Sequence, residues 1–252
     1  MKILVTNDDG IQSKGLKTLV DYLSKSNEVY VVAPDSQRSG FSHSMTFRRP
    51  MYMQEVFVKG AKQAFSLTGS PGDCVRFALK CLNLDIDMVV AGPNIGPNLT
   101  VDVYYSGTVG AASEGAILGK PSIALSYACK HIDENLLDFD ATCDFLEQNI
   151  NKFYFSHKSG TVFNINVPCA KKEEIKGVKV VPYGTKMFED VYEEHLDLVN
   201  NKKGFSLEGD FIAFDTPEET DAYYIGQNYI TVTPLKLDIC DHELLKILKE
   251  KF

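Results

Sequence analysis

Short apolar runs alternate with amphipathic segments along most of the chain. Residues 3–6 and 28–33 are almost continuously apolar, and between them apolar residues recur at spacings of three and four from Gly15 to Leu23. A strand, a helix and a second strand in such close succession form a βαβ unit, whose two strands lie parallel. Continuously apolar strands are typical of a sheet that helices cover on both faces.

The same alternation continues to about residue 170. It predicts strands at 87–91, 121–126 and 161–167 and helices at 73–82, 108–118 and 137–149. We therefore predict an α/β fold: a doubly wound, mostly parallel sheet in a Rossmann-like three-layer core. We assign residues 1–180 to this catalytic core.

The pattern changes in the last part of the chain. Residues 178–183, 211–215 and 229–234 have the character of strands, but polar stretches such as 189–197 and 200–204 separate them. No long helix connects these strands, so this part favours hairpins.

Residues 242–251 are predicted to form a short amphipathic helix that closes the chain. Its apolar side, formed by Leu244, Leu245 and Leu248, has little nearby sequence to pack against. We therefore assign residues 181–252 to a C-terminal hairpin and helix extension that packs on the core and on a neighbouring subunit.

The composition excludes several classes of protein. The 252 residues include 34 acidic and 26 basic side chains, a net charge of −8, which argues against a protein that coats a nucleic-acid polymer. No apolar run approaches the length of a membrane helix, and the first apolar run ends in charge, unlike a signal peptide. The six cysteines are scattered without a C-x-x-C pair, so we expect reduced thiols in a cytoplasmic protein.

Two adjacent acidic residues, Asp8 and Asp9, follow the first predicted strand. They stand at its carboxyl end, where open α/β sheets bind their ligands. Adjacent carboxylates repel each other, and their burial is costly unless a cation is present. A helix cap would account for Asp9 but not for both residues. We therefore predict that this pair belongs to a metal site.

The loop after the second predicted strand, residues 33–44, contains several serines, an arginine and a histidine. Such a loop is often only a polar turn. Its position beside the first strand nevertheless makes Ser39 or another serine a candidate metal ligand. His43 is a candidate acid or base, although a loop histidine is more often solvated.

The most informative segment is 92–110. Asn94 and Asn98 lie in a loop stiffened by glycine and proline, where an amide oxygen could bind a hard cation. Ser106, Gly107 and Thr108 then begin a helix of small residues. Two hydroxyls and free backbone N–H groups at a positive helix end suit an anion, although an ordinary helix cap would use the same residue types.

No lysine or arginine occurs from Cys81 to Gly119. If phosphate binds in this segment, its charge must be met by a metal ion, a helix end and hydroxyls. All the candidate ligands are oxygen atoms, which favours Mg²⁺ or Mn²⁺ over zinc. Such an ion polarises a phosphoryl oxygen and lowers the pKa of bound water, and an adjacent Asp could act as general base. The residues therefore predict a metal-dependent phosphoryl hydrolase.

At this point the sequence resembles the SurE survival-protein family of metal-dependent 5′-/3′-nucleotidases. The matching motifs cover nearly the whole chain and occur in order: ILVTNDDGI at 3–11, VVAPDSQRSG at 31–40, GSPGDCV at 69–75, GPNIGPN at 92–98, YYSGTVGAASEG at 104–115, NINVP at 164–168 and VTPLKLDI at 232–239.

The resemblance implies a role for each matching position. The metal ligands are Asp8, Asp9, Ser39 and Asn94, and Asp8 and Asp9 are also the catalytic residues. The phosphate-binding residues are Asn98, Ser106, Gly107 and Thr108. It further implies one Mg²⁺ or Mn²⁺ per subunit, nucleoside 5′- and 3′-monophosphates as substrates, short polyphosphates as further substrates, and a cytoplasmic homodimer or homotetramer in which the C-terminal segment crosses to the neighbour.

Two other hypotheses start from the same acidic pair. A receiver-like regulatory domain also has acidic residues after its first strand, but it needs a phospho-accepting Asp after the third strand, where this chain has an Asn-rich loop. A haloacid-dehalogenase-type phosphatase would form an aspartyl-phosphate, but its Asp-x-Asp spacing is absent because Gly10 follows the adjacent pair.

Overall fold

The computed structural model describes residues 1–129, 137–185, 191–197, 202–208 and 218–252. Nine strands form one mixed sheet in the order β3-β4-β2-β1-β5-β6-β7-β11-β8. They are β1 (Lys2–Thr6), β2 (Glu28–Pro34), β3 (Met53–Glu55), β4 (Ala61–Leu67), β5 (Met88–Ile95), β6 (Ser122–Ala128), β7 (Thr161–Pro168), β8 (Val178–Val180) and β11 (Ile230–Lys236). From β4 to β7 all neighbours run parallel, whereas β3 and β11 are antiparallel to β4 and β7.

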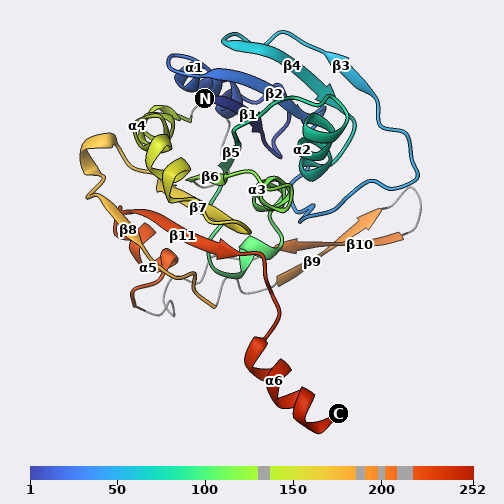
Figure 1. Cartoon of the computed structure of the whole chain (residues 1–252), viewed down its shortest axis with the longest axis vertical. Coiled ribbons are helices and arrows are strands. Elements are labelled where there is room, and N and C mark those ends of the chain that lie inside the picture. The colour runs from blue at the N-terminus through green and yellow to red at the C-terminus, as the bar shows by residue number, and fades with distance from the viewer. Residues whose placement is uncertain (130–136, 186–190, 198–201, 209–217) are drawn as a thin grey trace.

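Helices cover both faces of this sheet (Figure 1). The α-helices are α1 (Lys14–Leu23), α2 (Pro71–Lys80), α3 (Gly107–Ile117), α4 (Asp140–Ser156), α5 (Asp221–Ile225) and α6 (His242–Lys251); η1 (Thr100–Tyr104) and η3 (Lys172–Glu174) are short 3₁₀ turns. Helices α1 and α4 pack on one face, and α2 and α3 pack on the other. This arrangement confirms the predicted α/β fold.

Successive residues of β1 face opposite sides of the sheet, which explains why the strand is almost continuously apolar. Ile3 and Val5 belong to the core under α1 and α4, whereas Leu4 belongs to the core under α2 and α3. Because helices cover both faces, the three central positions of the strand are all apolar. Helices α1, α2, α3 and α6 begin at side-chain caps, and α2 has a reciprocal pair in which Ser70 and Asp73 each accept from the other's backbone N–H.

The structure differs from the sequence prediction in several elements. Strands β3 and β4 and helix α5 were not predicted, and α4 begins and ends later than the predicted 137–149. The C-terminal hairpin consists of β9 (Val191–Asp197) and β10 (Lys202–Glu208), within stretches that the sequence suggested were polar connections. The apolar residues of these strands are exposed among charged ones, so no buried face marks the strands. The predicted strand at 211–215 lies outside the described residues.

The cysteine prediction was wrong for two of the six residues. Cys129 and Cys169 form a disulfide, with their Cα atoms 4.7 Å apart, whereas the other four cysteines are free. Their proximity follows from sheet register: Ala128 lies opposite Pro168 on the parallel strands β6 and β7, so the next residues of each strand meet. No sequence spacing reveals a pairing of this kind.

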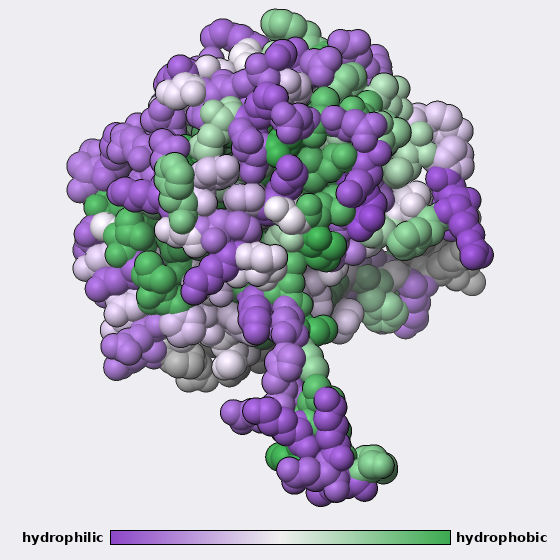
Figure 2. Space-filling model, viewed as in Figure 1, coloured by the Kyte–Doolittle hydropathy of each residue, from purple (hydrophilic) through white to green (hydrophobic). Residues whose placement is uncertain are grey.

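Helix α6 forms where it was predicted and projects away from the rest of the described chain (Figure 1). Leu244, Leu245, Ile247 and Leu248 are all exposed on it. Hydrophobic side chains are visible among hydrophilic ones along this projection in Figure 2. None of the described helices is long and apolar enough to cross a membrane.

Candidate active site

The loop after β1 is held in shape by the buried side chain of Asn7. Its amide nitrogen donates to the Gly10 carbonyl at 3.1 Å and to Ser13 Oγ at 2.8 Å, and its amide oxygen accepts from the Gly10 N–H. Gly10 has a φ of +98°, a value that glycine adopts without strain. The carboxylates of Asp8 and Asp9 are thereby presented at the carboxyl end of β1.

Asp8 is buried and connects three segments of the chain. Its Oδ1 accepts a hydrogen bond from Thr108 Oγ1 at 2.6 Å, and its backbone carbonyl accepts from the Arg38 N–H at 2.6 Å. Gly107 packs so closely that a Cβ there would lie 3.1 Å from Asp8 Cβ. The start of α3 and the loop after β2 are therefore both in contact with this aspartate.

Asp9 and Asn94 are brought together by the end of β5. Asp9 Oδ2 accepts from the Ile95 N–H at 3.3 Å. The pairing of β5 with β6 shifts register between Ala91 and Asn94, and the Gly92–Pro93 peptide between them is cis. The Asn94 amide nitrogen donates to the Gly96 carbonyl at 2.9 Å, so the amide oxygen is the atom suited to a cation.

Ser39 lies in the exposed loop after β2, where its Oγ accepts from Gln37 Nε2 at 3.1 Å. Strands β2, β1 and β5 are adjacent in the sheet, and all run in the same direction. Their carboxyl ends therefore meet at one edge, and the structure brings the segments carrying all four predicted metal ligands to it.

The chemistry of these four side chains fits a hard divalent ion. They offer two carboxylates, a hydroxyl and an amide oxygen, the donors that Mg²⁺ and Mn²⁺ prefer. The described part of the chain contains no group of three or more His, Cys, Asp or Glu residues that could hold a metal ion. A cation held by the four predicted ligands would have two acidic and two neutral oxygen ligands, whereas zinc prefers His and Cys.

The predicted phosphate-binding residue Asn98 is buried and anchored through its backbone. Its N–H donates to Asn166 Oδ1 at 2.8 Å, and its carbonyl accepts from Asn164 Nδ2 at 2.8 Å and from Asn166 Nδ2 at 3.0 Å. Its own Nδ2 donates to Ser126 Oγ at 2.8 Å. Asparagines from β7 thus fix the loop that follows β5.

The start of α3 is the other part of the predicted phosphate site. Ser106 caps the helix, with its Oγ accepting from the Val109 N–H at 3.1 Å. Gly107 and Thr108 follow in the first turn, and both are buried. The Thr108 hydroxyl donates to Asp8, so this residue links the two predicted sites. A helix start of this kind attracts anions through its unpaired N–H groups and its dipole.

The 3₁₀ turn η1 connects the loop that carries Asn98 to the start of α3, and the buried carboxylate of Asp221 binds the start of this turn. Its Oδ2 accepts from the Thr100 N–H at the start of η1, and its Oδ1 accepts from the N–H groups of Gly184 and Ala222, all at 2.8–2.9 Å. Burial raises the pKa of Asp221, although the hydrogen bonds act in the opposite direction. Burial, followed by repulsion from Asp221, raises the pKa of Asp102 in η1 to about 7.

His43 is hydrogen-bonded to a buried carboxylate rather than solvated, in contrast to the sequence expectation. Its Nε2 lies 2.9 Å from Glu114 Oε2, and Arg76 Nε lies 2.6 Å from Glu114 Oε1. Burial opposes ionisation of Glu114, but its two partners more than offset this and lower its pKa. Glu114 lies about two turns along α3 from Ser106, so this contact joins the loop after β2 to the middle of α3.

Sequence reasoning gave no role to the residues that support the site. Asn7 lies beside the acidic pair, Asn164 and Asn166 interrupt an apolar strand, and Asp221 lies far away in the chain. The two asparagines carried a usable signal, because polar residues inside a fully buried strand need hydrogen-bond partners. Asp221 carried no such signal.

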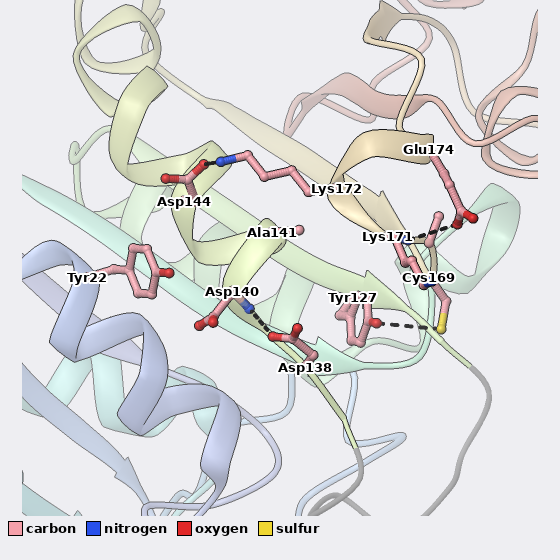
Figure 3. A pocket seen from close by; sticks show the side chains of 11 residues that line it. Tyr22, Tyr127, Asp138, Asp140, Ala141, Asp144, Cys169, Lys171, Lys172 and Glu174 are labelled. Carbon is pink, nitrogen blue, oxygen red and sulfur yellow. Dashed lines mark hydrogen bonds and ion pairs between the residues drawn. The ribbon is translucent and has the colours of Figure 1, made fainter.

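A separate cavity of about 410 Å³ lies between α4 and the segment after β7 (Figure 3). Asp138, Asp140 and Lys172 line it, together with Tyr127, whose hydroxyl lies 3.6 Å from Cys169 Sγ. None of the predicted site residues is among its lining residues. We therefore place the candidate active site at the carboxyl edge of the sheet and not in this cavity.

Comparisons with known proteins agree with the geometry. The family model described as "Survival protein SurE" matches residues 3–190. The "5'-nucleotidase SurE" of Clostridium botulinum is 41% identical over 100% of this chain and 99% of its own, and that of Syntrophomonas wolfei is 37% identical over 100% and 95%. The crystal structure of SurE protein from Aquifex aeolicus superposes with a TM-score of 0.84 at 32% identity, covering 100% of this chain and 99% of that one.

Proposed function

The chain belongs to the SurE survival-protein family, and from this we infer that it is a 5′-nucleotidase, an enzyme that releases phosphate from nucleoside 5′-monophosphates. The observation that carries this inference is the direct contact between the predicted metal site and the predicted phosphate site at the carboxyl edge of the sheet. The Thr108 hydroxyl, in the first turn of an anion-attracting helix, is hydrogen-bonded to the buried carboxylate of Asp8.

We propose that Asp8, Asp9, Ser39 and Asn94 hold one Mg²⁺ or Mn²⁺ per subunit and that the activity depends on this ion. The donor chemistry described above supports the proposal, because two carboxylates, a hydroxyl and an amide oxygen are the ligands that such an ion prefers. When bound, the ion polarises a phosphoryl oxygen and lowers the pKa of water beside it.

The substrate phosphate, in this proposal, lies against the start of α3. Backbone N–H groups at Gly107 and Thr108 and the Ser106 hydroxyl donate to its oxygens, and Asn98 positions it from the β5 side. No lysine or arginine occurs between Cys81 and Gly119, so the helix end and the hydroxyls supply the chain's own attraction for the anion in this segment.

We propose that water, and not an aspartate of the enzyme, attacks the phosphorus. One of the two carboxylates, Asp8 or Asp9, accepts a proton from this water as the new P–O bond forms. The bond between phosphorus and the ester oxygen breaks, and the nucleoside leaves as an alcohol after that oxygen gains a proton. Hydrolysis in ¹⁸O-labelled water tests the route, because label in an enzyme aspartate after a single turnover would reveal an acyl-phosphate.

Four broader features belong to the same proposal. The enzyme also accepts nucleoside 3′-monophosphates and short polyphosphates. It forms a homodimer or homotetramer, since α6 exposes four apolar side chains and, together with the hairpin, offers a surface for a second copy. It acts in the cytoplasm, where the disulfide between Cys129 and Cys169 would be unusual, so thiol titration of freshly isolated protein is a direct check.

The decisive experiment is a phosphate-release screen of nucleoside monophosphates with Mn²⁺ or Mg²⁺, with and without a chelator. Asp8→Asn should lose turnover by at least about 100-fold while remaining folded by circular dichroism, because it removes an acidic ligand and a candidate base. Asp21→Asn, which changes an exposed carboxylate on α1, is the matched control. Full activity of Asp8→Asn in the presence of the chelator would refute the metal-dependent mechanism.

A further inference from the structure

An exposed aromatic ring stands beside the proposed phosphate site. Tyr104 is the last residue of η1, two positions before Ser106, the cap of α3. It is 56% exposed, although large aromatic side chains generally gain from burial. Two residues of chain span at most about 7 Å, so the ring is carried on backbone that adjoins the proposed phosphate position.

A second tyrosine fixes the orientation of this ring. The hydroxyl groups of Tyr104 and Tyr183 lie 3.1 Å apart, and the two rings meet edge to face, with centroids 6.4 Å apart and planes at 85°. Tyr183 is itself only partly exposed. The exposed ring of Tyr104 thus contacts a less exposed neighbour through both its hydroxyl and its edge, which favours one orientation of the ring.

The backbone on both sides of this pair is also fixed. Ser42 donates from its hydroxyl to the Tyr104 carbonyl at 2.5 Å and from its N–H to the Tyr105 carbonyl at 2.9 Å. Asp221 accepts from the N–H of Thr100, at the start of η1, and from the N–H of Gly184, directly after Tyr183. One buried carboxylate therefore ties together the two segments that carry the rings.

We propose that Tyr104, oriented by Tyr183, is the platform on which the base of a nucleoside monophosphate stacks while its phosphate lies at the start of α3. This inference rests on the proposed function, because it takes that phosphate position as given. A ring fixed in advance loses little conformational freedom when a base binds, and every nucleobase has an aromatic face. The platform therefore selects nucleotides over other phosphate esters without selecting one base.

The test compares adenosine 5′-monophosphate with ribose 5-phosphate, which has the same phosphate ester but no base. Stacking on one aromatic side chain contributes roughly 1–3 kcal/mol. Tyr104→Leu should therefore lower the ratio of kcat/KM for the nucleotide to kcat/KM for the sugar phosphate about 10-fold, mainly through KM. Tyr104→Phe should restore most of this ratio, because it keeps the ring and loses only the hydroxyl contact with Tyr183.

Phe155→Ala is the matched control, since it removes an exposed aromatic from the last turn of α4. Helix α4 leads into the start of β7, so this ring lies toward the amino ends of the strands, away from the proposed site. The ratio should not change in this variant. An unchanged ratio in Tyr104→Leu, or an equal fall for both substrates, would overturn the stacking proposal while leaving the nucleotidase function intact.

A direct binding measurement separates failure of the inference from failure of the function. Saturation-transfer NMR with adenosine alone requires no hydrolysis. If the enzyme cleaves no phosphomonoester, the proposed function fails. The base-stacking role of Tyr104 is still supported in that case if adenosine binding disappears in Tyr104→Leu but persists in Phe155→Ala. Adenosine binding that is equally strong in Tyr104→Leu and the unaltered chain would overturn it.

Discussion

Asp102 carries its carboxyl group into a half-buried position near the buried Asp221, and its replacement by asparagine tests the electrostatics of η1. Burial and the neighbouring carboxylate raise the pKa of Asp102 from 3.8 to about 7. The folded chain therefore holds a proton that the unfolded chain releases at about pH 4. The stability associated with this proton is complete below pH 4 and is lost as the pH rises to about 7.

The size of the effect follows from the pKa difference. A shift of about three pKa units at 1.36 kcal/mol per unit corresponds to a loss of about 4 kcal/mol between acid and alkaline pH, of which about 2–3 kcal/mol falls between pH 5 and pH 8. Asp102→Asn cannot ionise and keeps nearly the same shape. Its stability relative to the unaltered chain should therefore rise by about 2–3 kcal/mol between pH 5 and pH 8.

Urea unfolding at several pH values and one fixed protein concentration measures this difference. Asp85→Asn is the control, because Asp85 is exposed and its hydrogen bond with Lys2 lowers its pKa, opposite to the shift of Asp102. If the curves for Asp102→Asn and the unaltered chain run parallel from pH 5 to pH 8, Asp102 is not the buried acid that the structure describes.

Three further predictions concern packing, the phosphate loop and the disulfide. Gly115→Ala should lower the free energy of unfolding by about 1–3 kcal/mol in urea, because the new methyl group would lie 2.9 Å from Val89; unchanged stability would contradict the close packing of α3 on β5. Asn166→Leu should raise the KM for nucleotides and cost about 1–3 kcal/mol of stability, since the buried N–H of Asn98 loses its acceptor; steady-state kinetics with an unaltered KM would argue against this loop as a phosphate site. Cys169→Ser should cost about 2–4 kcal/mol in thermal unfolding without reductant, and the difference from the unaltered chain should vanish when both are reduced.

The core of the fold could be predicted because its signals are local. The apolar runs of β1 and β2 and the three-and-four spacing of α1 each occupy one short window of sequence, and the structure places these elements where the pattern does. The edge strand β3 and the hairpin β9–β10 give no such signal. Nearly all of their described side chains are exposed, so no buried face imposes an apolar pattern on them.

In the candidate site, too, some residues could be predicted from local sequence and others could not. Asp8, Asn94 and Ser106 follow or begin predicted elements, so the topology of a parallel sheet alone indicates that they share an edge. Their supports come from elsewhere. Asn166, on β7, accepts a hydrogen bond from the N–H of Asn98 in the loop after β5. The disulfide, outside the site, likewise depends on the register of β6 and β7. Such contacts are created by tertiary packing and leave no spacing in the sequence.

The carboxylate of Asp221 has a consequence for the order in which the enzyme is made. A nascent chain that has emerged as far as residue 180 contains every proposed metal ligand and every proposed phosphate-binding residue. It lacks the acceptor that holds the N–H of Thr100, and it lacks β11, which separates β7 from β8 in the finished sheet. During synthesis from the N-terminus, the proposed site residues therefore appear before Asp221 and β11, so the loop that carries Thr100 gains this acceptor only after the last part of the chain has been made.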